Sequence, residues 1–212
     1  MRLGRVRSIL VCLSLSLVFV LPVRAAKTAF RITDMDWRDP HTYIDALGCR
    51  DVTDTAFLGF SMNGDLQSRL QADADMDSLL DLSYLIVFDP LDQAGAGGTL
   101  SFGPADCTAP LAGTSCAQSS SPPTYAYSNL PATCLGILDG TVRPYTPAVG
   151  SSTPPCFVAY LGSVTIDILG GVPLTLNDAH LAATYVSTPA TSLVNGLLRG
   201  FVSEADANYT IL

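Results

Sequence analysis

Four aspartates stand close together near the middle of the chain, at positions 1, 3, 5 and 9 of the segment that begins at Asp73. Calcium is a hard cation that binds about six to eight oxygens, and alternate residues of a tight turn direct side-chain oxygens toward one centre. The backbone carbonyl at position 7 would add a further ligand. The sequence therefore predicts a calcium site formed by Asp73, Asp75, Asp77, Leu79 and Asp81. The alternative is an acidic turn exposed to water, which screens the repulsion among the carboxylates.

Residues 73–82 resemble the Asp-rich calcium loops of FG-GAP repeats, thrombospondin type 3 repeats and dockerins, and also the first nine positions of an EF-hand. Two positions depart from the EF-hand. Ser78 replaces the glycine of the sharp turn, and Tyr84 replaces the bidentate glutamate. A strand-like sequence follows the loop, as in FG-GAP repeats. The chain has no internal repeat, so the resemblance implies a calcium loop but no family fold.

A second acidic group, Asp34, Asp36 and Asp39, lies just before His41. These carboxylates can cap turns and pair with Arg38, and they can also supply further cation ligands. A secreted hydrolase that uses them together with His41 is an alternative function. We assign no catalytic residue, because the chain lacks both a zinc-hydrolase HExxH motif and a serine-hydrolase nucleophile elbow.

The balance of charges argues against several classes of protein. The 212 residues contain 19 acidic and 11 basic side chains, and the net charge of −8 disfavours a nucleic-acid binder. Only 14% of residues are charged, while 17 glycines and 14 prolines disfavour a coiled coil or helical bundle. A hydrophobic content of 48% predicts a folded core rather than disorder.

Residues 1–25 have the pattern of a secretory signal peptide: basic residues, an apolar run and small residues at a cleavage site. Residues 26–212 are then a single secreted β-rich domain. No later apolar stretch is long enough to cross a membrane. We therefore expect a secreted or periplasmic protein.

Five cysteines follow the signal peptide, and an oxidising compartment favours their pairing. Proximity in the sequence favours the bridges Cys107–Cys116 and Cys134–Cys156. Cys49 is then left single, either as a buried free thiol or as half of an intermolecular bridge.

Several segments alternate apolar and polar residues, as strands do. Residues 56–61 and 82–88 are predicted strands, whereas the periodicity of residues 66–70 does not distinguish a helical turn from a strand. Residues 164–168 and 174–185 predict two or three antiparallel strands, with turns at 170–171 and 177–178, and they place His180 on the outer face.

Apolar residues recur at helical spacing over residues 190–205, which predicts an amphipathic helix. Residues 93–155 are rich in small residues and proline and predict a loop-rich excursion with short strands. The expected fold is mainly β: an antiparallel sandwich-like domain with long disulfide-stapled loops and one C-terminal helix.

The function that these patterns favour is a non-catalytic extracellular or envelope module, for binding or structure, with a calcium-stabilised Asp loop and a partner that the sequence does not identify. Besides the hydrolase, the second alternative is a carrier for an apolar ligand between the C-terminal strands and helix.

Overall fold

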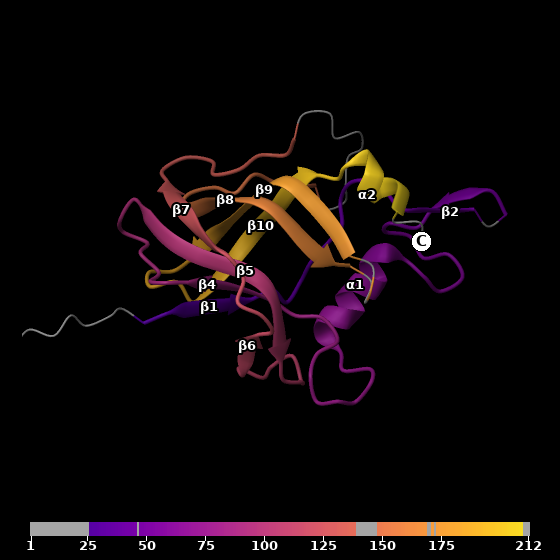
Figure 1. Cartoon of the computed structure of the whole chain (residues 1–212), viewed down its shortest axis with the longest axis horizontal. Helices are drawn as coiled ribbons and strands as arrows, with labels where there is room; N and C mark the ends of the chain where they lie inside the picture. Colours follow the sequence, from indigo (N-terminus) through magenta and orange to yellow (C-terminus); the bar gives the residue numbers. More distant parts are fainter. Residues whose placement is uncertain (1–25, 46, 139–147, 169–170, 172, 210–212) are drawn as a thin grey trace, which may run out of the picture.

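The computed structural model describes residues 26–45, 47–138, 148–168, 171 and 173–209 (Figure 1). The predicted signal peptide at residues 1–25 lies outside these ranges. The elements, in chain order, are β1 (Thr28–Arg31), β2 (Tyr43–Asp45), β3 (Cys49–Asp51), α1 (Met62–Gln71), β4 (Tyr84–Phe88), β5 (Gly97–Cys107), β6 (Cys116–Gln118), β7 (Thr124–Leu130), β8 (Cys156–Asp167), β9 (Pro173–Val186), β10 (Ser192–Phe201) and α2 (Glu204–Tyr209).

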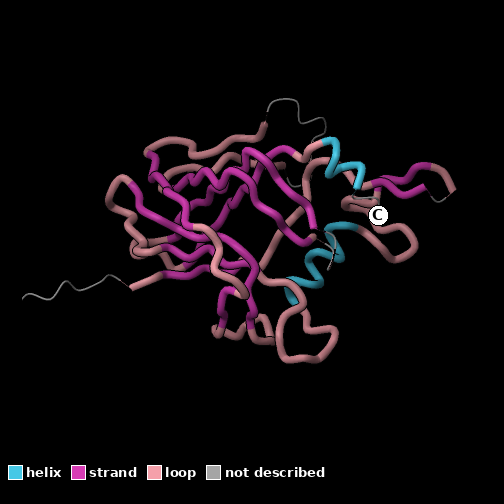
Figure 2. The backbone as a smooth tube through the Cα atoms, in the orientation of Figure 1, coloured by secondary structure: helices cyan, strands magenta, loops and turns pink. Residues whose placement is uncertain are grey.

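Eight of the described strands form one antiparallel sheet in the order β1-β4-β5-β7-β8-β9-β10, with β6 paired to the end of β5. The sheet curls over its own inner face, and α1 lies at one end of it (Figures 1 and 2). β2 and β3 form a separate hairpin. The predicted mainly β, antiparallel class is thus confirmed, and the opposing layers belong to one curled sheet.

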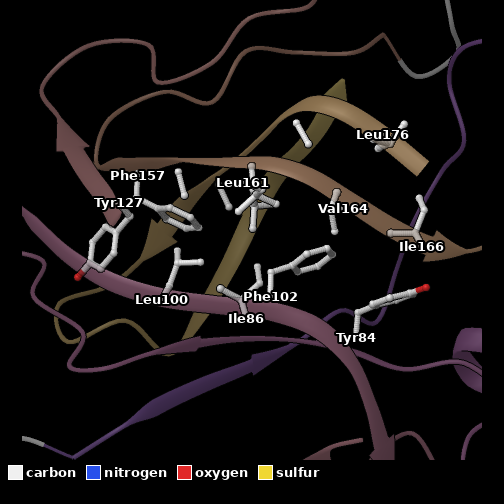
Figure 3. Packing of buried hydrophobic residues seen from close by; sticks show 14 of the residues in the cluster. Tyr84, Ile86, Leu100, Phe102, Tyr127, Phe157, Leu161, Val164, Ile166 and Leu176 are labelled. Atoms are coloured by element: carbon white, nitrogen blue, oxygen red, sulfur yellow. The ribbon is translucent and has the colours of Figure 1, made fainter. Parts of the chain in front are cut away.

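Alternate residues of the strands fill the space inside the curl (Figure 3). Phe88 is fully buried at the centre, where its ring meets Phe157 edge-on at 5.1 Å and Tyr127 edge-on at 5.0 Å. Aromatic pairs of this geometry add to the free energy that burial itself supplies. Phe30 and Tyr185 also pack against the Phe88 ring. Aromatic side chains therefore fill this part of the interior.

β8 and β9 form the longest paired region of the sheet. The predicted alternation over residues 164–168 and 174–185 is confirmed, and His180 lies on the outer face beside Tyr160, with ring centroids 5.0 Å apart. The turn predicted at 177–178 is wrong, because β9 runs through it. The regular strand backbone is interrupted at Asp178, which has a left-handed φ of 50°. Of the turn at 170–171, only Gly171 lies in the described residues.

The amphipathic helix predicted over residues 190–205 is wrong for most of its length. Residues 192–201 form β10, which pairs with β9, and a helix begins only at Glu204. Glycine inside a helix costs about 1 kcal/mol relative to alanine, and this segment contains Gly196 and Gly200. Pairing with β9 instead satisfies the backbone.

The strand predicted at residues 56–61 is also wrong. Phe57 and Phe60 close a tight turn, in which Leu58 and Gly59 have left-handed φ values of 52° and 89°. Ser61 then caps α1 by accepting a hydrogen bond from the Gly64 N–H at 3.2 Å. Residues 66–70 are therefore helical.

Both predicted disulfides, Cys107–Cys116 and Cys134–Cys156, are present. They connect the loop-rich stretch to the sheet, although this stretch contains β5, a strand of 11 residues and longer than expected. Cys49 is the unpaired cysteine among the described residues. Its side chain is exposed on β3, so the interpretation as a buried thiol is wrong. No helix in the described ranges is long and apolar enough to cross a membrane.

Candidate metal centre

The Asp loop, residues 73–81, begins and ends against the C-terminus of α1. Met62, Leu66 and Leu70 fix this helix in the core. After the helix ends, the Asp81 N–H donates to the Ala72 carbonyl at 3.0 Å, and the next residue's N–H donates to the Arg69 carbonyl, also at 3.0 Å. The two ends of the loop are therefore held together before any cation is considered.

The far side of the loop is attached to the end of β5. The Leu80 N–H donates to the Cys107 carbonyl, and the Ala109 N–H donates to the Ser78 carbonyl, each at 2.9 Å. Cys107 is disulfide-bonded to Cys116. In Figure 1 the loop that follows α1 accordingly lies beside β6. The loop thus joins the helix to the disulfide-linked end of the sheet.

Aspartate side chains shape the backbone of the loop. Asp73 accepts hydrogen bonds from the N–H groups of Asp77 and Ser78, both at 3.0 Å. Asp75 also accepts from the Asp77 N–H, at 3.2 Å, and Asp81 accepts from the Ala74 N–H, at 3.0 Å. Ser78 has a left-handed φ of 76°, which is the conformation that glycine provides in the loops it resembles.

Three of the predicted ligands converge. Carboxylate oxygens of Asp73, Asp75 and Asp81 all lie within 4.8 Å of one another. Calcium–oxygen bonds of about 2.3–2.6 Å separate two ligand oxygens by at most about 5 Å, so the group fits such an ion. Asp77 and Leu79 are not part of this group. Asp77 instead accepts from the Leu79 N–H at 2.7 Å.

Within the part of the chain that the structure describes, no ion pair involves these three carboxylates. Asp75 and Asp81 are exposed, and the hydrogen bonds described above come from neutral backbone N–H groups of the same loop. Like charges this close repel one another, and a divalent cation removes that repulsion while using the lone pairs that the backbone leaves available. The donor set is therefore chemically suited to calcium.

The second acidic group is arranged differently. Asp36 pairs with Arg38 at 3.2 Å, as the sequence predicts. His41 Nδ1 lies 2.5 Å from Oδ2 of Asp51, a carboxylate that sequence reasoning missed. Burial disfavours the charge on Asp51, but the Thr53 N–H and the His41 ring outweigh it and hold the pKa of Asp51 below its usual value.

Asp51 and His41 meet because β2 and β3 form a hairpin, in which Tyr43 and Asp51 are cross-strand partners. Thr53 ties the same turn together: its hydroxyl accepts from the Thr42 N–H at 2.8 Å. These contacts give the His–Asp pair a clear structural role at the base of the hairpin. The only signal in the sequence is the short spacing between the two residues, which is too common to be diagnostic.

No protein-family model, curated protein or solved structure matches this chain.

Proposed function

We propose that this protein is a secreted, non-catalytic binding or structural module of the extracellular space or cell envelope, and that calcium in the Asp loop stabilises it. The observation that carries the proposal is the convergence of Asp73, Asp75 and Asp81 in a loop that is fixed at both ends. Such a loop needs little rearrangement to bind a cation, so most of the binding free energy adds to the stability of the fold.

Two independent features support the proposed location. Residues 1–25 have the pattern of a signal peptide. Two disulfides fit an oxidising environment, which is where extracellular and periplasmic proteins fold. Extracellular calcium is abundant enough to fill weak sites, with dissociation constants of about 10⁻⁴–10⁻³ M. A loop without the bidentate glutamate suits this range.

The proposal is tested by melting the disulfide-bonded protein in excess calcium and in EDTA. Calcium at about 100 times its dissociation constant adds about 2.7 kcal/mol, which raises the Tm by about 5–10 °C in a chain of this size. Asp81→Asn removes one of the three converging carboxylates and should abolish most of this rise. The matched control is Asp34→Asn, in the other acidic group, which should retain it. Equal Tm values in calcium and EDTA would overturn the proposal.

A further inference from the structure

A cleft of about 320 Å³ lies between the Asp loop and the ends of β5 and β8. Among the described residues, its lining includes five carboxylates from three separate parts of the chain and no lysine, arginine or histidine; the five are Asp75, Asp77, Asp81, Asp106 and Asp167. A water molecule takes about 30 Å³ of liquid volume, so the space is far larger than a bare metal ion needs.

Ser83 supplies a second observation that points to a ligand. The residue lines the cleft and is 3% exposed, yet its hydroxyl oxygen has no hydrogen-bond partner among the described residues. Its neighbour Tyr84 packs into the interior, so alternation along the strand directs Ser83 to the outer face. There Leu80 and Ala105, which also line the cleft, form a small cluster of their own.

A buried hydroxyl without a partner costs free energy, and a ligand that donates a hydrogen bond would recover it. The backbone carbonyl of Ser83 is already used, since it accepts from the Ala105 N–H at 2.9 Å. The hydroxyl is therefore the polar group that this residue offers to a ligand.

The rest of the lining is apolar. Leucine, proline and alanine side chains lie between the carboxylates; they are Leu79, Leu80, Leu82, Pro104 and Ala105. Carboxylates separated by apolar surface match a molecule in which methylene segments separate positive charges. A single ammonium group would meet only some of the carboxylates, whereas a linear polyamine can meet several.

We propose that this cleft binds a linear polyamine, with its ammonium groups at the carboxylates, its methylene chain on the apolar lining and one N–H donated to the Ser83 hydroxyl. The site goes beyond the calcium proposal, but the two sites share Asp75 and Asp81, so calcium and the polyamine are expected to compete for these two carboxylates. Asp106 and Asp167 line the cleft without belonging to the metal group, and Asp73 belongs to the metal group without lining the cleft.

The test is calorimetric titration of the disulfide-bonded protein with spermidine after calcium has been removed by dialysis, so that Asp75 and Asp81 are free of metal. Saturable binding is expected, and it should weaken as the salt concentration rises, because salt screens exposed charges. Asp106→Asn keeps an oxygen to accept from the Ser119 hydroxyl but loses the charge. We expect it to lower the affinity by about tenfold, which corresponds to about 1.4 kcal/mol.

Ser83→Ala separates a ligand contact from a structural role. Removing an unsatisfied buried hydroxyl should leave the Tm unchanged or raise it, whereas the affinity for spermidine should fall. Asp73→Asn is the matched control for the metal: it should lose the calcium effect on the Tm and retain spermidine binding. Failure of the calcium proposal and failure of the polyamine proposal are thus distinguishable.

Three outcomes would overturn the polyamine site. The first is no saturable binding of spermidine by the unmodified protein. The second is an unchanged affinity in both Asp106→Asn and Ser83→Ala. The third is equal affinity for spermidine and for N-acetyl-lysine methylamide, which would make a lysine side chain of another protein the occupant.

Discussion

Ser78 occupies the position of the Asp loop where the resembling calcium loops have glycine, and its φ is 76°. A residue with a Cβ in this left-handed region is strained by about 1–2 kcal/mol. The strain persists because the Ser78 N–H is bonded to Asp73 and its carbonyl to the Ala109 N–H. The serine at this position is therefore a cost within the loop.

Ser78→Gly should consequently stabilise the protein by about 1 kcal/mol, both with and without calcium, because the loop then has the same conformation without strain. Chemical denaturation in calcium and in EDTA measures the effect. Ala74→Gly is the matched control in the same loop. Ala74 is not among the left-handed residues, so glycine should cost about 0.5–1 kcal/mol there. Destabilisation by both variants would contradict this account of Ser78.

At the scale of elements, β10 rests on β9 with little room at one glycine. A Cβ built on Gly200 would lie 2.8 Å from the Asn177 carbonyl oxygen, whereas one on Gly196 would lie 3.9 Å from its nearest neighbour, the Ala182 carbonyl oxygen. β10 can therefore come close to β9 at Gly200 only because a side chain is absent.

Gly200→Ala should therefore destabilise the protein by about 1–3 kcal/mol, as other overpacking substitutions do. Gly196→Ala has room for its methyl group and should change stability by much less. Denaturant unfolding of the two variants checks the difference. If residues 190–205 were a helix, both substitutions would stabilise by about 1 kcal/mol, so that result would contradict β10.

A comparison of two strands shows which parts of the fold the sequence pattern predicts. The strict alternation around Val164 and Ile166 has one interpretation, and the strand is there. In residues 192–201 the apolar residues fit both helical and strand spacing, and the outcome depends on an open edge of β9 that the local sequence does not reveal.

The candidate site likewise contains residues that a local sequence pattern predicts and residues that it does not. Asp73, Asp75 and Asp81 lie within one short loop, so their spacing alone predicted that they converge. Asp106, Asp167 and Ser83 line the adjacent cleft because separate parts of the sheet meet there. No local pattern connects these three residues, since the strand register brings them together. Both disulfides were predictable because each joins neighbouring cysteines.

At the scale of the whole molecule, Tyr84 ties together two strands that are not neighbours in the sheet. Tyr84 lies at the start of β4 and Asp167 at the end of β8. The Tyr84 hydroxyl accepts a hydrogen bond from the Asp167 N–H at 2.7 Å and donates one to the Asp167 carbonyl oxygen at 3.1 Å. Its ring stacks on Phe102 at 5.7 Å. This contact closes one end of the curl.

Burial raises the pKa of Tyr84 to about 12, although the Asp167 N–H favours the charged form. The ordinary value of 10.0 applies to the unfolded chain. The neutral phenol of Tyr84 therefore contributes fully to the free energy of unfolding below pH 10, and this contribution is lost as the pH rises through 12. Stability should fall over this window, and Tyr84→Phe should fall less steeply, as measured by denaturant unfolding at each pH. Tyr43→Phe, at a phenol that is 42% exposed, is the control. Parallel pH profiles for Tyr84→Phe and the unmodified protein would contradict the role of Tyr84.

The order of strands in the sheet also predicts the order in which the strands pair during folding. β8, β9 and β10 are consecutive neighbours, so they can pair across short connections. β1 pairs with β4, and this register joins Thr28 to Phe88 across the whole of α1 and the Asp loop. Pairings between residues distant in sequence form slowly, because a long stretch of chain must first be ordered. β1, the first of the described strands in chain order, is therefore expected to be among the last to dock, and the curl should stay open on the β1 side until the helix and the loop are in place.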